Sequence, residues 1–173
     1  LYKKLIGLEK SKNRKESKTF LLEGIKEYEM ATMHHFEIEQ LILPEDIDNE
    51  VIIKSKSTPI IYFSRELFDS LCYRKGIDNS LAIVKSKKHD LDSNIKLSES
   101  ATLLVVEGVE KPGNLGAILR TADAAGVDMV ICCDLQTDLY NPNVIRSSVG
   151  CVFTNKIAIT DSQTAKNFLM SQN

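Results

Sequence analysis

The chain lacks any hydrophobic run long enough to cross a bilayer, and its first residues do not have the pattern of a secretory signal. Hydrophobic residues make up 43% of the sequence and charged residues 27%, which is ordinary for a globular protein. A length of 173 residues suits one large domain or two small ones. We therefore expect a globular protein of the cytoplasm with no membrane-embedded part.

Cysteine is also scarce, because the sequence has only four, and their spacing does not match a metal site. Cys132 and Cys133 lie in an apolar stretch that predicts a strand. The three histidines, His34, His35 and His89, show no ligand partner in the sequence, so we expect them at the surface or at helix caps. These patterns predict reduced, buried thiols and no bound metal.

A strong net charge of either sign is absent as well, since the formal net charge is −2. The first 18 residues differ from the rest, because seven basic side chains stand there against two acidic ones: Lys3, Lys4, Lys10, Lys12, Arg14, Lys15 and Lys18 against Glu9 and Glu16. Such a basic patch is typical of a surface that binds phosphates. The alternative is a solvated helix and loop with no ligand.

Strands and helices alternate along the chain, which predicts an α/β or α+β fold. In the first part we expect helices at 2–9, 24–34 and 64–73, strands at 19–22, 38–43, 59–63 and 80–84, a basic loop up to residue 17 and a short apolar run at 51–53. The polar segment after residue 84 predicts a boundary, with domains at 1–88 and 101–173 and a linker at 89–100, in which Leu91, Ile95 and Leu97 could still pack. In the second domain we expect strands at 102–106, 127–133 and 151–159 and helices at 114–125, 141–149 and 161–170.

The most informative stretch is the strand at 102–106 with the turn and helix that follow it. Asn114 stands after a Pro-Gly turn, where the N-cap of a helix is expected. Apolar residues then recur at helical spacing and form one face: Leu115, Ile118, Leu119, Ala122 and Ala125. Asn114 and Arg120 lie off this face, and Gly126 follows the helix as a C-terminal glycine. A strand end joined by such a turn to a helix is where α/β proteins bind ligands.

The run Pro112-Gly-Asn-Leu-Gly-Ala-Ile-Leu-Arg-Thr-Ala122 resembles the first motif of the SpoU (TrmH-type) RNA ribose methyltransferases, a branch of the SPOUT superfamily. Their second motif, an Asn-Pro turn, a short helix and a Ser-Ala-Gly-Ala-like run, is similar to Tyr140-Asn-Pro-Asn-Val-Ile-Arg-Ser-Ser-Val-Gly-Cys-Val-Phe153. Residues 1–98 resemble the N-terminal substrate-binding domain that is frequent in the family and is similar to a small RNA-binding ribosomal protein. That likeness depends on Lys18-Thr-Phe-Leu-Leu-Glu-Gly-Ile25 and the helix after it.

The third motif of the family, a Gly-x-Glu-x-x-Gly loop and a Ser-Leu-Asn helix, has no counterpart before Asn173. In the family this part threads a trefoil knot and supplies most of the S-adenosylmethionine pocket. The resemblance therefore implies a small N-terminal α/β RNA-binding domain, followed by the first part of a Rossmann-like SPOUT methyltransferase domain whose knot-forming part is absent. We expect an incomplete chain whose cofactor-binding residues lie beyond Asn173.

The resemblance implies methyl transfer from S-adenosylmethionine to a ribose 2′-hydroxyl of RNA, with ribosomal RNA as the expected substrate and transfer RNA as the alternative. Arg120 and Asn114 would be the catalytic residues. The Arg120 guanidinium, with its fixed charge and planar fork, would stabilise the reacting oxygen, and Asn114 would hold Arg120 or the ribose. The implied RNA contacts are Lys12, Arg14, Lys15, Lys18, Arg146 and Ser148. The family also implies a homodimer.

Other interpretations of these residues stay open. Asn114 could be only a helix cap, Arg120 only a solvated helix residue, and the Ser148 hydroxyl could satisfy the backbone of a turn. A non-catalytic RNA-binding protein would keep the same two-domain layout. An unrelated nucleotide-binding domain is disfavoured, because Gly113-Asn-Leu-Gly116 does not fit the Gly-x-Gly-x-x-Gly pattern.

Overall fold

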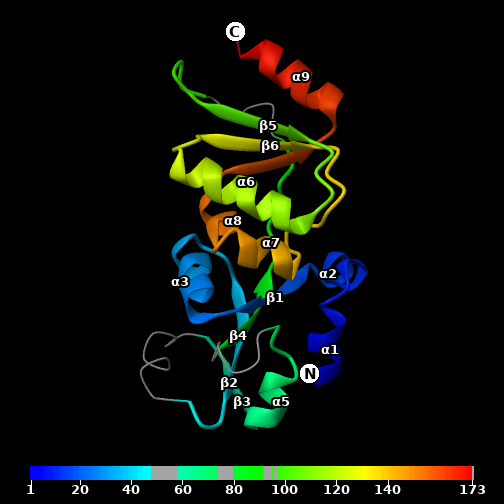
Figure 1. Ribbon diagram of the computed structural model, residues 1–173, viewed down its shortest axis with the longest axis vertical. Helices are drawn as coiled ribbons and strands as arrows, with labels where there is room; N and C mark the ends of the chain where they lie inside the picture. Colours follow the sequence, from blue (N-terminus) through cyan, green and yellow to red (C-terminus); the bar gives the residue numbers. More distant parts are fainter. Residues whose placement is uncertain (48–57, 74–79, 92–94, 96, 173) are drawn as a thin grey trace. The chain divides into compact units, whose positions relative to one another are not determined.

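The computed structural model describes residues 1–47, 58–73, 80–91, 95 and 97–172. The chain divides into two compact units, Leu1–Ser86 and Lys87–Asn173 (Figure 1). Within the described ranges, no helix is long and apolar enough to cross a membrane. The short apolar run expected at 51–53 falls outside the described residues.

The first unit joins short helices to a mixed sheet. Its elements are α1 (Tyr2–Gly7), α2 (Ser11–Ser17), β1 (Thr19–Glu23), α3 (Ile25–Met33), β2 (Ile38–Pro44), β3 (Ile60–Phe63), α5 (Arg65–Asp69) and β4 (Leu81–Lys85). The strand order is β1-β4-β2-β3, with β4 antiparallel to β1 and β2, and β3 parallel to β2. The prediction of a loop up to residue 17 was wrong, because helix α2 forms there. Lysine and arginine, which are frequent in this segment, are good helix formers.

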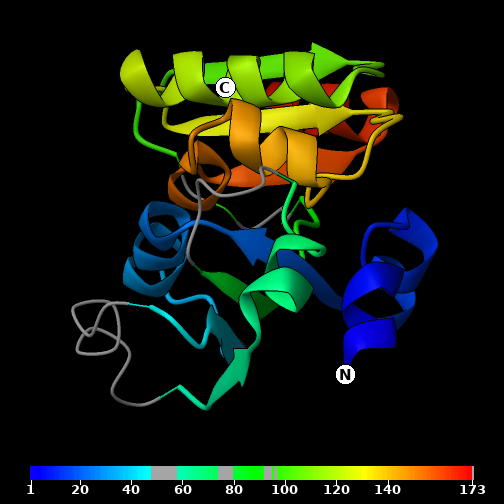
Figure 2. The ribbon, with the colours of Figure 1, turned by 60° about the horizontal axis from the view of Figure 1, so that its bottom comes forward.

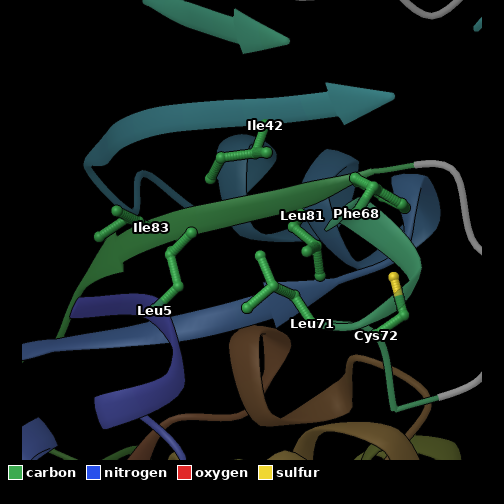
Figure 3. Packing of buried hydrophobic residues seen from close by; sticks show 7 residues of the cluster. All are labelled: Leu5, Ile42, Phe68, Leu71, Cys72, Leu81 and Ile83. Carbon is green, nitrogen blue, oxygen red and sulfur yellow. The ribbon is translucent and has the colours of Figure 1, made fainter. Parts of the chain in front are cut away.

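The core of the first unit forms where α1 and α5 meet the sheet. Figure 3 shows its seven side chains converging from the two helices, the strands and the segment after α5: Leu5, Ile42, Phe68, Leu71, Cys72, Leu81 and Ile83. Leu5 is the buried residue of α1. Its burial anchors α1, and with it the turn into α2, against the sheet.

The second unit is built on a parallel sheet. Its elements are β5 (Leu103–Glu107), α6 (Pro112–Ala124), β6 (Met129–Cys133), α7 (Pro142–Ser147), α8 (Cys151–Thr154), β7 (Ile157–Thr160) and α9 (Ser162–Ser171). The strand order is β5-β6-β7, and every residue of the central strand β6 is buried, as is typical of a parallel sheet covered on both faces. Met129, Ile131 and Cys133 pack with Ala165 and Phe168 of α9. Figure 2 shows α6 and α9 on opposite sides of these strands.

Two sequence-based expectations for this unit were wrong. The strand expected at 151–159 is helix α8 followed by β7, because a short apolar run does not distinguish a buried helical turn from a strand. Helix α6 begins at Pro112 with Lys111 as its N-cap, so Asn114 is not the cap. Proline favours the first helical position, because its fixed φ already matches the helix and its missing N–H is not needed there. Gly126 does have the positive φ (68°) expected after this helix.

The segment expected as a linker, 89–100, packs on the second unit at its described residues. The Ile159 amide donates to the His89 carbonyl over 2.6 Å, and Asp90 pairs with Ile159 in a parallel bridge. Leu91, Ile95 and Leu97 pack against the cluster beneath α9. The apolar residues of this polar stretch thus extend the core of the second unit.

Candidate functional site

Helices α6 and α7 meet at Gly116. A Cβ added there would lie 1.9 Å from the Ser147 Oγ and 2.7 Å from both the Ser148 nitrogen and the Val144 carbonyl oxygen. Only glycine allows two backbones to approach so closely. The sequence signal is a glycine beside the apolar stripe of the expected helix, and the close contact that it makes was not predicted.

Asn114 and Arg120 are both exposed on α6, as expected from their place off the apolar face. They are six residues apart, so the helix separates them by about 9 Å along its axis and about 120° around it. The two side chains are not hydrogen-bonded to each other in this structure, so the expected contact of Asn114 with Arg120 is not seen. Among the residues that the structure describes, none forms a hydrogen bond or ion pair with the Arg120 guanidinium.

The backbone around Arg120 is fastened to α8 on both sides. The Asn155 amide, at the end of α8, donates from Nδ2 to the Leu119 carbonyl over 3.0 Å. The Thr154 hydroxyl donates to the Asp123 carboxylate, one turn further along α6. These contacts fix the part of α6 that carries Arg120, and they do not involve the Arg120 side chain.

Cys151, the first residue of α8, is electrostatically coupled to the same part of α6. Burial raises the pKa of the Cys151 thiol, the Asp123 charge raises it further, and the Arg120 charge acts in the opposite direction. Burial likewise raises the pKa of Cys132 to about 12 and also raises that of Cys133. None of the four cysteines forms a disulfide in this structure, and Cys72, Cys132 and Cys133 are buried.

The second motif forms α7 and its connection to α8. Asn141 is the N-cap of α7, and its side chain accepts from the Asn143 amide over 2.9 Å. Ser148 is fully buried; its Oγ donates to the Ile145 carbonyl over 2.8 Å and accepts from the Val152 amide over 3.4 Å. The buried Ser148 side chain therefore links α7 to α8, and its hydroxyl is not accessible to a ligand in this structure.

Arg146 and Val149 are the exposed residues at the end of α7. The Arg146 guanidinium donates from Nη2 to the Asn143 amide oxygen over 3.0 Å. Val149 has a positive φ of 53° and a side chain that is 51% exposed. Val149 occupies the left-handed position after the helix that glycine usually takes, so its backbone is strained for a β-branched residue. It follows the exposed Arg146 by three residues.

A groove of about 270 Å³ lies between β5 and α9, lined by Val105, Glu107, Cys133, Ser162, Ala165, Lys166, Leu169 and Met170. At its polar end the Ser162 hydroxyl contacts the carboxylates of Glu107 and Asp134. The groove adjoins the carboxyl ends of the strands, where open α/β sheets bind ligands. Its volume is below the usual range for small-molecule pockets, which is about 300–1,000 Å³.

The basic residues near the N-terminus divide into two kinds. Lys12, Lys15 and Lys18 are exposed, and Lys12 lies 3.8 Å from Glu16 in an ion pair. Arg14 is only 4% exposed, and its Nη1 donates to the carbonyls of Leu8 and Glu9, each over 2.7 Å. The expectation that Arg14 lies at the surface with the lysines was therefore wrong.

A partly buried polar pair was also not predicted from the sequence. His89, expected at the surface or a helix cap, is half-buried, and its Nε2 lies 2.6 Å from the Tyr140 hydroxyl. The polar residues around His89 gave no signal of this contact, because its partner is 51 residues away.

The model of the SpoU rRNA Methylase family matches residues 101–172, which hold α6, α7 and the groove, and the model of an MRM3-like substrate binding domain matches residues 2–82. A crystal structure of an RNA 2′-O ribose methyltransferase is 32% identical and superposes over 99% of this chain and 67% of its own with a TM-score of 0.84. The chain belongs to the SpoU rRNA methylase family. The mixed α/β SpoU fold expected from the two motifs is confirmed.

Two further relatives of the SpoU family are similar to this chain. The 23S rRNA (guanosine(2553)-2′-O)-methyltransferase RlmP of Bacillus subtilis (strain 168) is 28% identical over 84% of this chain and 56% of its own length. The AdoMet-bound rRNA methyltransferase from Sinorhizobium meliloti is 25% identical, with a TM-score of 0.86 over 99% of this chain and 65% of its own. The chain thus spans between about half and two thirds of the length of these relatives.

Proposed function

We propose that this protein is an S-adenosylmethionine-dependent RNA methyltransferase that modifies a ribose 2′-hydroxyl of ribosomal RNA. The observation that carries the proposal is Arg120, an exposed guanidinium on a braced helix within the region matched by the SpoU family model. The names of relatives support the substrate class, since three that match this chain are 23S rRNA 2′-O-methyltransferases. Such a substrate implies a cytoplasmic enzyme.

The proposed role of Arg120 is electrostatic. S-adenosylmethionine supplies the methyl group in this class of reaction. An arginine is a poor base because its pKa is very high, but its fixed charge stabilises an oxygen that develops negative charge and binds a neighbouring phosphate through two N–H groups. Asn114, exposed near the start of the same helix, is proposed to bind the ribose.

RNA binding is proposed for the exposed lysines of the first unit, Lys12, Lys15 and Lys18, and for Arg146 in the second. Arg14 and Ser148 are left out, because both are buried and hydrogen-bonded to backbone atoms.

We further propose that the enzyme acts as a homodimer, and light scattering of the intact protein is expected to give twice the monomer mass.

We do not expect the described residues to enclose the cofactor by themselves. The groove beside α9 is small, and its carboxylates are already bonded to Ser162. We therefore expect the 173-residue chain to bind S-adenosylmethionine weakly or not at all in titration calorimetry. A micromolar dissociation constant would show that this chain forms a complete cofactor site.

The decisive test is Arg120→Ala in the intact enzyme. Loss of a charge partner of the transition state typically lowers the rate by about 10²-fold or more, so single-turnover transfer of labelled methyl to RNA should fall by that factor. Arg120→Lys should not restore the rate fully, because an ammonium lacks the planar fork.

The melting temperature should not change in Arg120→Ala, because the side chain is exposed. Lys156→Ala, which removes another exposed cation of the second unit, is the matched control and should retain full activity. Unchanged transfer by Arg120→Ala would remove this residue from the mechanism.

A second candidate is an RNA-binding protein without catalysis. The exposed lysines on and beside α2 favour it, because binding of phosphates by a basic surface needs no cofactor. RNA binding by the intact protein without any methyl transfer to rRNA would support this candidate.

A further inference from the structure

The end of α7 carries an exposed valine in a backbone conformation that valine rarely adopts. Val149 has a φ of 53°, in the left-handed region where the Cβ of a β-branched residue is crowded. Glycine suits this position after a helix because it has no Cβ, yet the glycine stands one residue later, at Gly150. The Val149 side chain is 51% exposed, so burial offsets little of the strain. Valine is therefore not the residue that stability alone favours at this position.

The surrounding hydrogen bonds impose this conformation. The Val149 amide donates to the Arg146 carbonyl over 3.1 Å. The Gly150 amide donates to the Ile145 carbonyl over 3.3 Å. These two bonds form a Schellman motif, which ends a helix with a left-handed residue. Ser148, the preceding residue, is fully buried and its hydroxyl also donates to the Ile145 carbonyl. The backbone is thus fixed on both sides of the valine.

The segment that carries Val149 runs along α6 toward Arg120, since α7 and α8 both pack against α6 (Figure 1, Figure 2). Before Val149, the Ser148 nitrogen would lie only 2.7 Å from a Cβ added at Gly116. After it, burial raises the pKa of the Cys151 thiol and the Arg120 charge opposes that shift, so the guanidinium acts on this thiol. Gly116 and Arg120 are four residues apart and lie on one side of α6. Val149 therefore lies beside the part of α6 that carries Arg120.

We propose that Val149 contacts the substrate: its side chain packs against the nucleotide whose ribose faces Arg120 and so positions the 2′-hydroxyl for methyl transfer. This inference rests on the function proposed above. Enzymes that act on one nucleotide commonly take it out of the stack and hold it against apolar side chains. A β-branched side chain on a fixed backbone is already ordered before the RNA binds. Strained residues held by their surroundings are typical of such sites.

The experiment is Val149→Gly in the intact protein, because it should change stability and activity in opposite directions. Relief of the strained φ should raise the melting temperature by about 2–4 °C. Single-turnover transfer of labelled methyl to saturating, unmethylated 23S rRNA should fall by about 10- to 100-fold, because small displacements of reacting groups have effects of this size. RNA affinity should change little, since phosphate contacts dominate it.

Three results would overturn the inference. Unchanged transfer by Val149→Gly would show that the side chain does not contact the substrate. A lower melting temperature would show that the valine stabilises the fold by packing. Loss of transfer together with a halved mass in light scattering would place Val149 at a subunit interface instead. Absence of transfer by the unmodified protein would refute the proposed function, and this inference with it, so the two failures are distinguishable.

Val149→Ala separates the side chain from the backbone. Alanine keeps the Cβ and a restricted backbone but removes the two methyl groups, so transfer should fall as it does in Val149→Gly. Full transfer by the alanine variant would overturn the inference, because the loss in the glycine variant would then come from backbone freedom.

His35 offers a matched control in the first unit. It is exposed, its φ is 58°, and it follows α3 in the same motif. The His35 amide donates to the Thr32 carbonyl over 3.1 Å, and the Phe36 amide donates to the Ala31 carbonyl over 2.9 Å. His35→Gly should also stabilise the protein, by less than Val149→Gly because histidine tolerates positive φ better, and should retain full transfer. Equal loss of transfer in both glycine variants would overturn the specific role of Val149.

Discussion

Arg14 and Arg120 are the same residue type in two different roles, and the sequence alone did not distinguish them. Arg14 stands in a basic run, which predicted a surface contact with phosphate, but its guanidinium closes the C-terminal end of α1. Free carbonyls at a helix end attract a cation, so a buried arginine is stable there. Arg120 lies off the apolar face of its helix, and that periodicity correctly predicted its exposure.

Replacement of Arg14 by alanine should destabilise the first unit. The carbonyls of Leu8 and Glu9 would lose a charged donor in a buried place, and hydrogen bonds to charged groups are worth about 1.5–3 kcal/mol. Urea unfolding should show a loss of that size.

Lys15→Ala, next in the chain but exposed, is the control for Arg14→Ala and should change stability by less than about 0.5 kcal/mol. Equal stability of the two variants would mean that the Arg14 guanidinium does not cap α1.

At the level of elements, the sequence predicted most helices and strands but not how closely they pack. The order of β5, α6, β6 and α7 followed from apolar periodicity and from Pro-Gly and Asn-Pro signals. Helix α8 was missed because four apolar and β-branched residues suit a strand equally well. Gly150 with its positive φ (83°) and the Asn155 side chain mark its ends. Local patterns do not encode such contacts between helices.

The close approach of α6 and α7 leads to a prediction for Gly116. Alanine there would place its Cβ against the Ser147 hydroxyl and the backbone of α7, and overpacking of this kind typically costs about 1–3 kcal/mol. Thermal unfolding should reveal the loss, and methyl transfer should fall with it, because the two motifs would move apart.

Gly113→Ala is the control for this prediction. Gly113 lies in the same helix with nothing within 4 Å of its added Cβ, so alanine should be neutral or stabilising by up to about 1 kcal/mol. A Gly116→Ala variant as stable as Gly113→Ala would contradict the close contact.

On the scale of the whole molecule, the sequence indicated two domains, and the chain has two compact units with the boundary between Ser86 and Lys87. The polar composition after residue 84 predicted a linker in which Leu91, Ile95 and Leu97 could pack, and these three residues do pack on the second unit. The contact between His89 and Tyr140 could not be predicted, because it joins residues that only the fold brings together.

The lysines proposed to bind RNA and the proposed catalytic Arg120 lie in different units, so the two proposals can be tested separately. Each phosphate that a lysine neutralises contributes about 0.7–0.9 to the slope of log affinity against log salt concentration. If Lys12, Lys15 and Lys18 each bind one phosphate, their joint replacement by alanine should reduce that slope by about two to three. Filter-binding or anisotropy titrations of the intact protein over a range of salt concentrations measure it.

The matched control for the salt series is Lys26→Ala, Lys156→Ala and Lys166→Ala combined, which removes the same charge from exposed sites elsewhere. This control should leave the slope unchanged, because net charge alone does not release counterions from the RNA backbone. At saturating RNA, the Lys12, Lys15 and Lys18 variant should still transfer methyl, since Arg120 is intact. An unchanged slope in that variant would assign these lysines to the solvated surface and place the RNA contacts elsewhere.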